Sequence, residues 1–86
     1  MYRIEFKRAA EKYLRKLPTK TQEKILSAIK GICQSPPMGD IKPMQGVADL
    51  YRLRVGMYRI IFSYALDGQI TIVLVQEIGP RGDVYK

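Results

Sequence analysis

Residues 51–64, YRLRVGMYRIIFSY, constrain the fold more than any other part of the sequence. The stretch predicts two strands joined by a tight turn at Gly56-Met57, because glycine accepts the positive φ angle that a two-residue hairpin turn needs. Successive side chains of a strand point to opposite faces, so Arg52 and Arg54 share one face of the first strand. A hairpin with arginines on one side is therefore the first expectation.

The same turn places Arg54 directly opposite Arg59, with Arg52 alongside on that face. Like charges opposed across a strand pair are destabilising. Guanidinium groups bind phosphate oxygens bidentately and stay charged at physiological pH. Each arginine taken alone is best interpreted as an ordinary exposed strand residue, but the three together favour an anion site. With Arg81 and Tyr85, discussed below, the set suits a scissile phosphate in RNA.

The spacing of apolar residues predicts the elements that come before the hairpin. Strict alternation predicts a strand at residues 2–6, and a helical period predicts a helix over residues 7–17. A second helix is expected to begin at Thr19, because Thr19 and Gln22 have the spacing of a capping box. Ser35-Pro36-Pro37 ends it.

The rest of the chain adds a loop and a third strand of the hairpin sheet. Residues 38–49 show no clear period and predict a loop, Asp67-Gly68 is a second turn signal, and residues 70–78 form an apolar strand ended by Gly79-Pro80. The expected fold is a single α+β domain over residues 1–86. Its order is strand-helix-helix-strand-strand-strand, with an antiparallel sheet and an N-terminal helical hairpin packed on one face.

The second turn fixes a further register. If Asp67-Gly68 is a two-residue loop, Arg59 lies opposite Gln76 and the last strand ends beside the first turn. Arg81 would then emerge at the edge that carries the other arginines, with Tyr85 within reach. A tyrosine can stack on a nucleobase or donate its hydroxyl proton.

Charge and composition narrow the classes of partner and site. The net charge is +7, and residues 1–30 hold nine bases against three acids, a net +6, so polyanions are the default partners. With no histidine and one cysteine, the chain excludes a His/Cys metal site and a histidine-based triad, and we expect no cofactor. The single cysteine and the lack of a signal peptide or long apolar run predict a cytoplasmic protein without a membrane contact.

Three segments, in this order and spacing, resemble the RelE/ParE superfamily of bacterial toxins, and specifically its RelE branch. They are Tyr2-Arg3-Ile4-Glu5-Phe6 before a lysine-rich helix pair, Leu50 to Phe62, and Glu77 to Tyr85. The resemblance implies a toxin that cleaves mRNA in the ribosomal A site without a metal. In such toxins the ribose 2′-hydroxyl attacks the adjacent phosphate. The resemblance also implies a cognate antitoxin as partner and a toxin–antitoxin hetero-oligomer.

Carried over by position, the resemblance assigns five catalytic residues. Arg52 and Arg54 match two basic positions that are often lysine in relatives, Arg59 matches the arginine that steadies transition-state charge, Arg81 matches the arginine assigned to the leaving group, and Tyr85 matches the stacking tyrosine. Arginine is a much poorer general base than lysine, because its pKa stays above about 12. Another group, water or a ribosomal contact must then take the 2′-hydroxyl proton.

Two other functions are compatible with the same sequence. A ParE-type inhibitor of DNA gyrase would share the fold but cut nothing, although such toxins generally lack the full basic set. A non-catalytic RNA-binding module would bind RNA in a salt-dependent way and yield no cleavage products.

Overall fold

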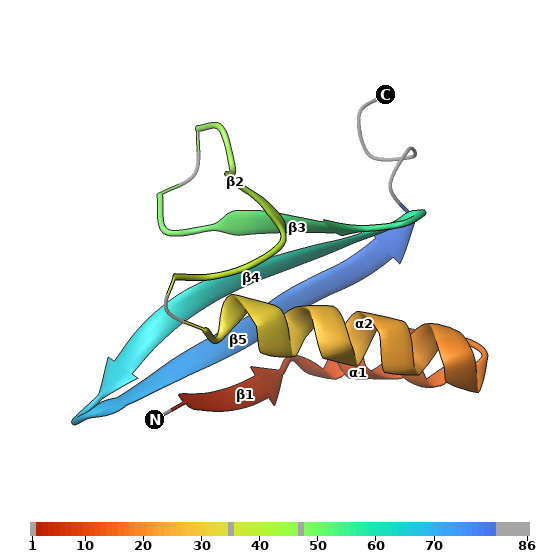
Figure 1. Ribbon diagram of the computed structural model, residues 1–86, viewed down its shortest axis with the longest axis horizontal. Coiled ribbons are helices and arrows are strands. Elements are labelled where there is room, and N and C mark those ends of the chain that lie inside the picture. The colour runs from red at the N-terminus through yellow and green to blue at the C-terminus, as the bar shows by residue number, and fades with distance from the viewer. Residues whose placement is uncertain (1, 35, 47, 81–86) are drawn as a thin grey trace.

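The computed structural model describes residues 2–34, 36–46 and 48–80, which form one sheet and two helices (Figure 1). The elements in chain order are β1 (Tyr2–Phe6), α1 (Arg8–Arg15), α2 (Thr19–Ile32), β2 (Asp40–Pro43), β3 (Tyr51–Val55), β4 (Tyr58–Asp67) and β5 (Ile70–Pro80). The sheet order is β1-β5-β4-β3-β2. Strands β3, β4 and β5 are consecutive and antiparallel, as the turn signals predict.

The α+β class and the strand-helix-helix-strand order are confirmed, and the sheet is mixed rather than wholly antiparallel. The first strand, β1, pairs in parallel with the last, β5, so these two strands lie side by side, while the N-terminus and the end of β5 lie at opposite ends of the sheet (Figure 1). Parallel neighbours need a long connection, and here the whole helical hairpin and β2–β4 supply it. Sequence alternation cannot reveal the direction of such a distant pairing.

Both helices cover the same face of the sheet. The apolar stripes of the helices are buried, as their spacing predicts: Ala10 and Leu14 in α1, and Ile25, Ile29 and Ile32 in α2. They form one core with inward-facing strand residues, among them Leu53, Ile60, Phe62, Val73, Val75 and Ile78. The other face of the sheet therefore carries the alternate residues of each strand.

The second helix begins at Thr19 as predicted, but without the predicted capping box. Its N-cap is Pro18, which forms no side-chain cap and has no N–H to donate. The Gln22 side chain instead donates from Nε2 to the carbonyl oxygen of Leu17 at 2.8 Å and to that of Arg15 at 3.3 Å. Gln22 thus ties the start of α2 to the end of α1.

The prediction of a loop over residues 38–49 is wrong in part, because β2 lies within it. Its four residues pair with β3 at the edge of the sheet, with Asp40 opposite Arg54 and Lys42 opposite Arg52. Only Ile41 turns toward the core, so the strand is too short to show a period. Pro43 at its end is tolerated because an edge strand does not need every N–H.

The first hairpin has the predicted register and the second does not. Val55 pairs with Tyr58 around the Gly56-Met57 turn, where Gly56 has a φ of 56°. In the second hairpin Asp67 pairs with Ile70, so the loop is Gly68-Gln69 rather than Asp67-Gly68. Both turns have a glycine of positive φ at their first position. Asp67-Gly68 and Gly68-Gln69 both contain such a glycine, so the sequence alone does not decide which of them forms the second loop.

A bulge in β5 shifts the register once more. Phe62 pairs with Val75 but Ile61 pairs with Glu77, so Gln76 is the extra residue. Arg59 consequently lies opposite Gly79, not Gln76. The strand still ends beside the first turn, because Tyr58 pairs with Pro80.

Tyr64 links β4 to the C-terminal end of α2, and this link predicts a pH dependence. Its hydroxyl donates to the carbonyl oxygen of Ile32 at 3.2 Å, and burial raises the pKa of this phenol above its usual value. Above about pH 10 the unfolded chain loses the phenol proton while the folded chain keeps it. The free energy of unfolding should therefore be constant in this respect below pH 10 and fall above it.

Tyr64→Phe should remove this fall and should cost about 1 kcal/mol at neutral pH, because the Ile32 carbonyl loses its donor. Urea unfolding at pH 7 to 11 measures both effects. A Cys33→Ala background isolates the phenol, because burial also raises the pKa of the Cys33 thiol. An identical alkaline fall with and without the Tyr64 hydroxyl would contradict the prediction.

Candidate functional site

Three of the four predicted arginines lie together on the face of the sheet that the helices leave uncovered. Leu53 and Ile60 pair with each other in the core, so the flanking pairs, Arg54 with Arg59 and Arg52 with Ile61, project from the opposite side. We call Arg52, Arg54 and Arg59 the arginine cluster. The predicted pairing of Arg54 with Arg59 across the two strands is thus confirmed.

Two members of the arginine cluster are buried. Arg52 is 7% exposed and Arg59 is 5% exposed, whereas the Arg54 side chain is 41% exposed. Arginine is rarely buried unless it is paired, because removing its charge from water is costly. The fold therefore holds two cations with a high desolvation cost on one face of the β3–β4 hairpin.

Two carboxylates flank the arginine cluster. Glu77 Oε1 accepts a hydrogen bond from Arg59 Nη2 at 3.0 Å, and Asp40 Oδ2 lies 3.7 Å from Arg54 Nε. Glu77 belongs to β5 and Asp40 to β2, so they approach from opposite sides of the β3–β4 hairpin. They balance part of the positive charge and leave a polar rim around it.

Arg52 is the least balanced member of the cluster. Its Nη1 is buried and forms no hydrogen bond with any residue of the described chain. Its cross-strand neighbours are Lys42, another cation, and the apolar Ile61. A buried guanidinium nitrogen without an acceptor is costly, and an anionic oxygen of a ligand would satisfy it.

Three residues around the arginine cluster were not predicted from the sequence. Asp40 and Lys42 were assigned to a loop, and Glu77 was assigned to no role. Only Glu77 has a signal in the sequence: Val75-Gln76-Glu77-Ile78 breaks the alternation, and a bulge is the way to bury both apolar ends.

Arg81 and Tyr85, the other two predicted site residues, lie outside the described residues. The strand that leads to Arg81 ends at Pro80 beside Tyr58, next to the Gly56-Met57 turn. On the helical side, Lys24 of α2 lies over this turn, because its Nζ is 3.5 Å from the position that a Cβ on Gly56 would take. The end of the hairpin therefore joins the arginine cluster to the helices.

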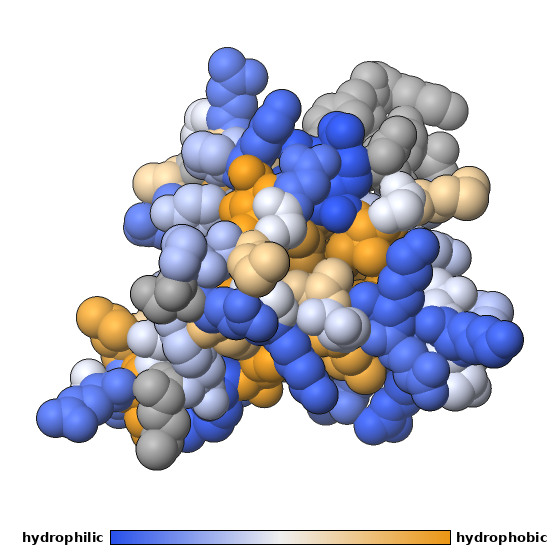
Figure 2. All heavy atoms as spheres, in the orientation of Figure 1, coloured by the Kyte–Doolittle hydropathy of each residue, from blue (hydrophilic) through white to orange (hydrophobic). Residues whose placement is uncertain are grey.

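The helices carry a separate basic surface. The eight bases of residues 7–30 lie in or at the ends of α1 and α2 and are all exposed, and Figure 2 shows long hydrophilic side chains over the end of the molecule where α1 and α2 lie. Such a surface raises the local concentration of a polyanion.

The described residues hold neither a candidate metal site nor a membrane-spanning helix. No group of three or more His, Cys, Asp or Glu side chains in residues 2–34, 36–46 and 48–80 is arranged to hold a metal ion. Over the same residues, neither helix has the length and apolar character needed to cross a bilayer.

Comparison with known proteins places this chain in a family. Residues 4–85 match the model of the ParE toxin of the type II toxin–antitoxin system parDE. The chain is 26% identical over 88 residues to a Methanocaldococcus jannaschii protein named "Putative toxin RelE1", with 99% of this chain and 96% of that protein covered.

Solved structures agree. The toxin chain of the RelE–RelB complex from Pyrococcus horikoshii superposes with a TM-score of 0.74 at 26% identity, covering 95% of this chain and 97% of that chain. The isolated E. coli RelE toxin gives a TM-score of 0.74 at 25% identity, covering 99% and 92%. The chain therefore belongs to the ParE toxin family within the RelE/ParE superfamily, and is a RelE-like toxin of a type II toxin–antitoxin system.

Proposed function

We propose that the chain is a ribosome-dependent endoribonuclease that cleaves mRNA by attack of a ribose 2′-hydroxyl on the adjacent phosphate. The observation that carries the proposal is the buried Nη1 of Arg52, which has no acceptor within the described chain and lies in a cluster of arginines. A phosphodiester supplies the missing anionic oxygens. The same cluster would bind the extra charge that the phosphate gains in the transition state.

The three arginines differ in the role that their surroundings support. Arg54, the exposed member, would meet the RNA backbone first. Arg52 and Arg59 would stabilise the charge on the phosphate from buried positions, where salt screens their own charges little. Arg81 and Tyr85 stay in the proposal as sequence predictions for the leaving group and for base stacking.

The proposed partners follow from charge and from the solved relatives. A RelE–RelB pair is the subject of the Pyrococcus horikoshii structure, and we propose a cognate antitoxin and a hetero-oligomer for this chain. An acidic or amphipathic antitoxin segment would complement the +7 charge. The ribosome and mRNA, both polyanions in the cytoplasm, would be bound by the basic helical surface.

Inhibition of DNA gyrase is the second candidate, favoured by the match to the ParE family model. It requires a protein target and no phosphate chemistry. Supercoiling inhibition by the purified protein, with intact mRNA on ribosomes, would select it over the first candidate. Salt-dependent RNA binding without cleavage would instead select the non-catalytic module.

The proposal predicts that the purified protein cuts mRNA on programmed ribosomes, leaving a 2′,3′-cyclic phosphate and a 5′-hydroxyl. Arg54→Ala combined with Arg59→Ala should slow cleavage by about 100-fold or more, since even one lost donor to a developing oxyanion costs that much. Mapping of the mRNA ends detects the cleavage, and single-turnover rates measure the loss in the double variant.

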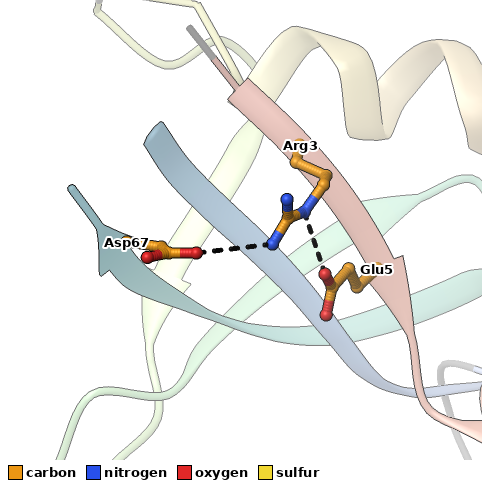
Figure 3. Close-up of polar contacts among 3 residues, drawn as sticks. All are labelled: Arg3, Glu5 and Asp67. Carbon is orange, nitrogen blue, oxygen red and sulfur yellow. Dashed lines mark hydrogen bonds and ion pairs between the residues drawn. The ribbon is translucent and has the colours of Figure 1, made fainter. Parts of the chain in front are cut away.

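Arg3→Ala is the matched control. Arg3 lies on the same face at β1, where Glu5 at 2.9 Å and Asp67 at 3.9 Å neutralise it (Figure 3). Its loss should change the cleavage rate less than about threefold, because surface ion pairs contribute little. Equal losses in Arg3→Ala and in the double variant would mean that net charge, not the cluster, drives cleavage.

A further inference from the structure

The arginine cluster holds transition-state charge but contains no group that readily accepts a proton. The 2′-hydroxyl must lose its proton for its oxygen to attack phosphorus. A base must therefore come from a neighbouring residue, and the described chain offers carboxylates on the same face of the sheet. We propose that Glu77 is this general base, an inference that rests on the proposed nuclease function.

Position is the first argument. Glu77 accepts the hydrogen bond from Arg59 at 3.0 Å and stands in one cross-strand row with Ile61 and Arg52. Two strand spacings, about 10 Å, separate Glu77 from Arg52 along this row. A phosphate held by the arginines would then have a carboxylate at the side of its ribose.

The bulge at Gln76 is the second argument. In a regular strand, successive side chains alternate, so Glu77 would lie on the face opposite to Gln76 and point toward the helices. The extra residue instead keeps Gln76 and Glu77 on the same face, where Gln76 Nε2 donates to Ser63 Oγ at 3.0 Å. Bulges are common beside active sites because they re-aim a side chain in this way.

Accessibility is the third argument. The Glu77 side chain is 63% exposed although its partner Arg59 is buried. The hydrogen bond from Arg59 is made to Oε1, and within the described chain no hydrogen bond is made to Oε2. One carboxylate oxygen is thus fixed by the cluster, and the other is available to a ligand.

The proton transfer would also neutralise the Glu77 carboxylate at the step in which the phosphorane forms. Glu77 takes the 2′-hydroxyl proton, the oxygen's electron pair forms the new bond to phosphorus, and the bond to O5′ breaks with its electron pair on O5′. That oxygen takes a proton from water, and Glu77 returns its own proton to solvent. Protonated Glu77 no longer neutralises Arg59, so the Arg59 charge acts more strongly on the phosphorane as it forms.

Asp40 is the rival carboxylate. It lies 3.7 Å from Arg54 on the short edge strand β2, beyond hydrogen-bond reach of that guanidinium. Glu77 contacts the buried arginine and Asp40 contacts the exposed one. The geometry favours Glu77 because the charge of a buried cation responds more strongly to the protonation of its partner.

The test is the single-turnover rate of mRNA cleavage on programmed ribosomes as a function of pH. Glu77→Gln keeps an oxygen that accepts from Arg59 but cannot take a proton. We expect its rate to fall about 100- to 10,000-fold, with ribosome affinity unchanged. Formate should partly restore Glu77→Ala, and Glu5→Gln, a glutamate of the same face bonded to Arg3, should stay within about threefold of the wild type.

The outcomes separate this inference from the function beneath it. A Glu77→Gln rate within threefold of the wild type would overturn the role of Glu77 and leave the nuclease standing. Loss in Glu77→Gln without formate rescue of Glu77→Ala would also overturn it, since a positioning role explains that pattern. A wild-type protein that cuts no mRNA would overturn the proposed function and the inference together.

Discussion

Arg52→Met should make the fold more stable by about 1–3 kcal/mol while slowing mRNA cleavage by about 100-fold or more. The gain is expected because Arg52 is 7% exposed and its buried Nη1 has no acceptor within the described chain. Methionine fills a similar volume without that desolvation cost. It also removes the repulsion from Lys42 across the β2–β3 pair.

Urea unfolding at neutral pH measures the first effect, and cleavage on ribosomes measures the second. Arg54→Met is the matched control, because the Arg54 side chain is 41% exposed and lies near Asp40. We expect it to change stability by less than about 0.5 kcal/mol while still slowing cleavage. A loss of stability in Arg52→Met would show that the folded protein already satisfies this guanidinium, and would remove the main support for an anion site.

Opposite signs for stability and activity are the mark of a functional site. A residue kept for packing would lower both when it is replaced. The arginine cluster pairs Arg54 with Arg59 where a stable sheet would have opposite charges or apolar contacts. Natural proteins retain such conflicts where the ligand, rather than the fold, resolves them.

The first hairpin was predictable because its information is local. Gly56 is the one glycine between two alternating segments, so turn, register and faces follow together. The second hairpin offers Asp67-Gly68 and Gly68-Gln69 as equally reasonable loops, and the protein uses the latter. Moving that loop by one position shifts the pairing by two residues, which preserves the faces but changes every partner.

The pairings that the sequence could not predict are those made at a distance. The edge strand β2 exists only because β3 is beside it, and the direction of β1 depends on β5 at the other end of the chain. For the same reason Arg52, Arg54 and Arg59 could be found from one hairpin, whereas Asp40 could not, and the only signal for Glu77 is the broken alternation at the bulge. The candidate base was hidden because a bulge, not alternation, sets its direction.

Phe62→Ala should produce the largest loss of stability. Phe62 is fully buried in β4, with its ring centroid 5.7 Å from that of Tyr51 and 5.5 Å from that of Tyr64. Replacing a buried phenylalanine by alanine costs about 3–5 kcal/mol. Small domains are stable by about 0.05–0.15 kcal/mol per residue, so roughly 4–13 kcal/mol here, and the variant should lose a large share of it.

Urea unfolding followed by circular dichroism measures this loss, since the chain has no tryptophan to report by fluorescence. Leu66→Ala, on the same strand but 79% exposed, should cost less than about 0.5 kcal/mol. A Phe62→Ala loss below about 1 kcal/mol would contradict the burial on which the helix-covered face depends. Arg52→Met is expected to raise the free energy of unfolding and Phe62→Ala to lower it, so the two substitutions have opposite effects on the two faces of one sheet. That contrast would separate the face that holds the fold together from the face that the fold keeps for a ligand.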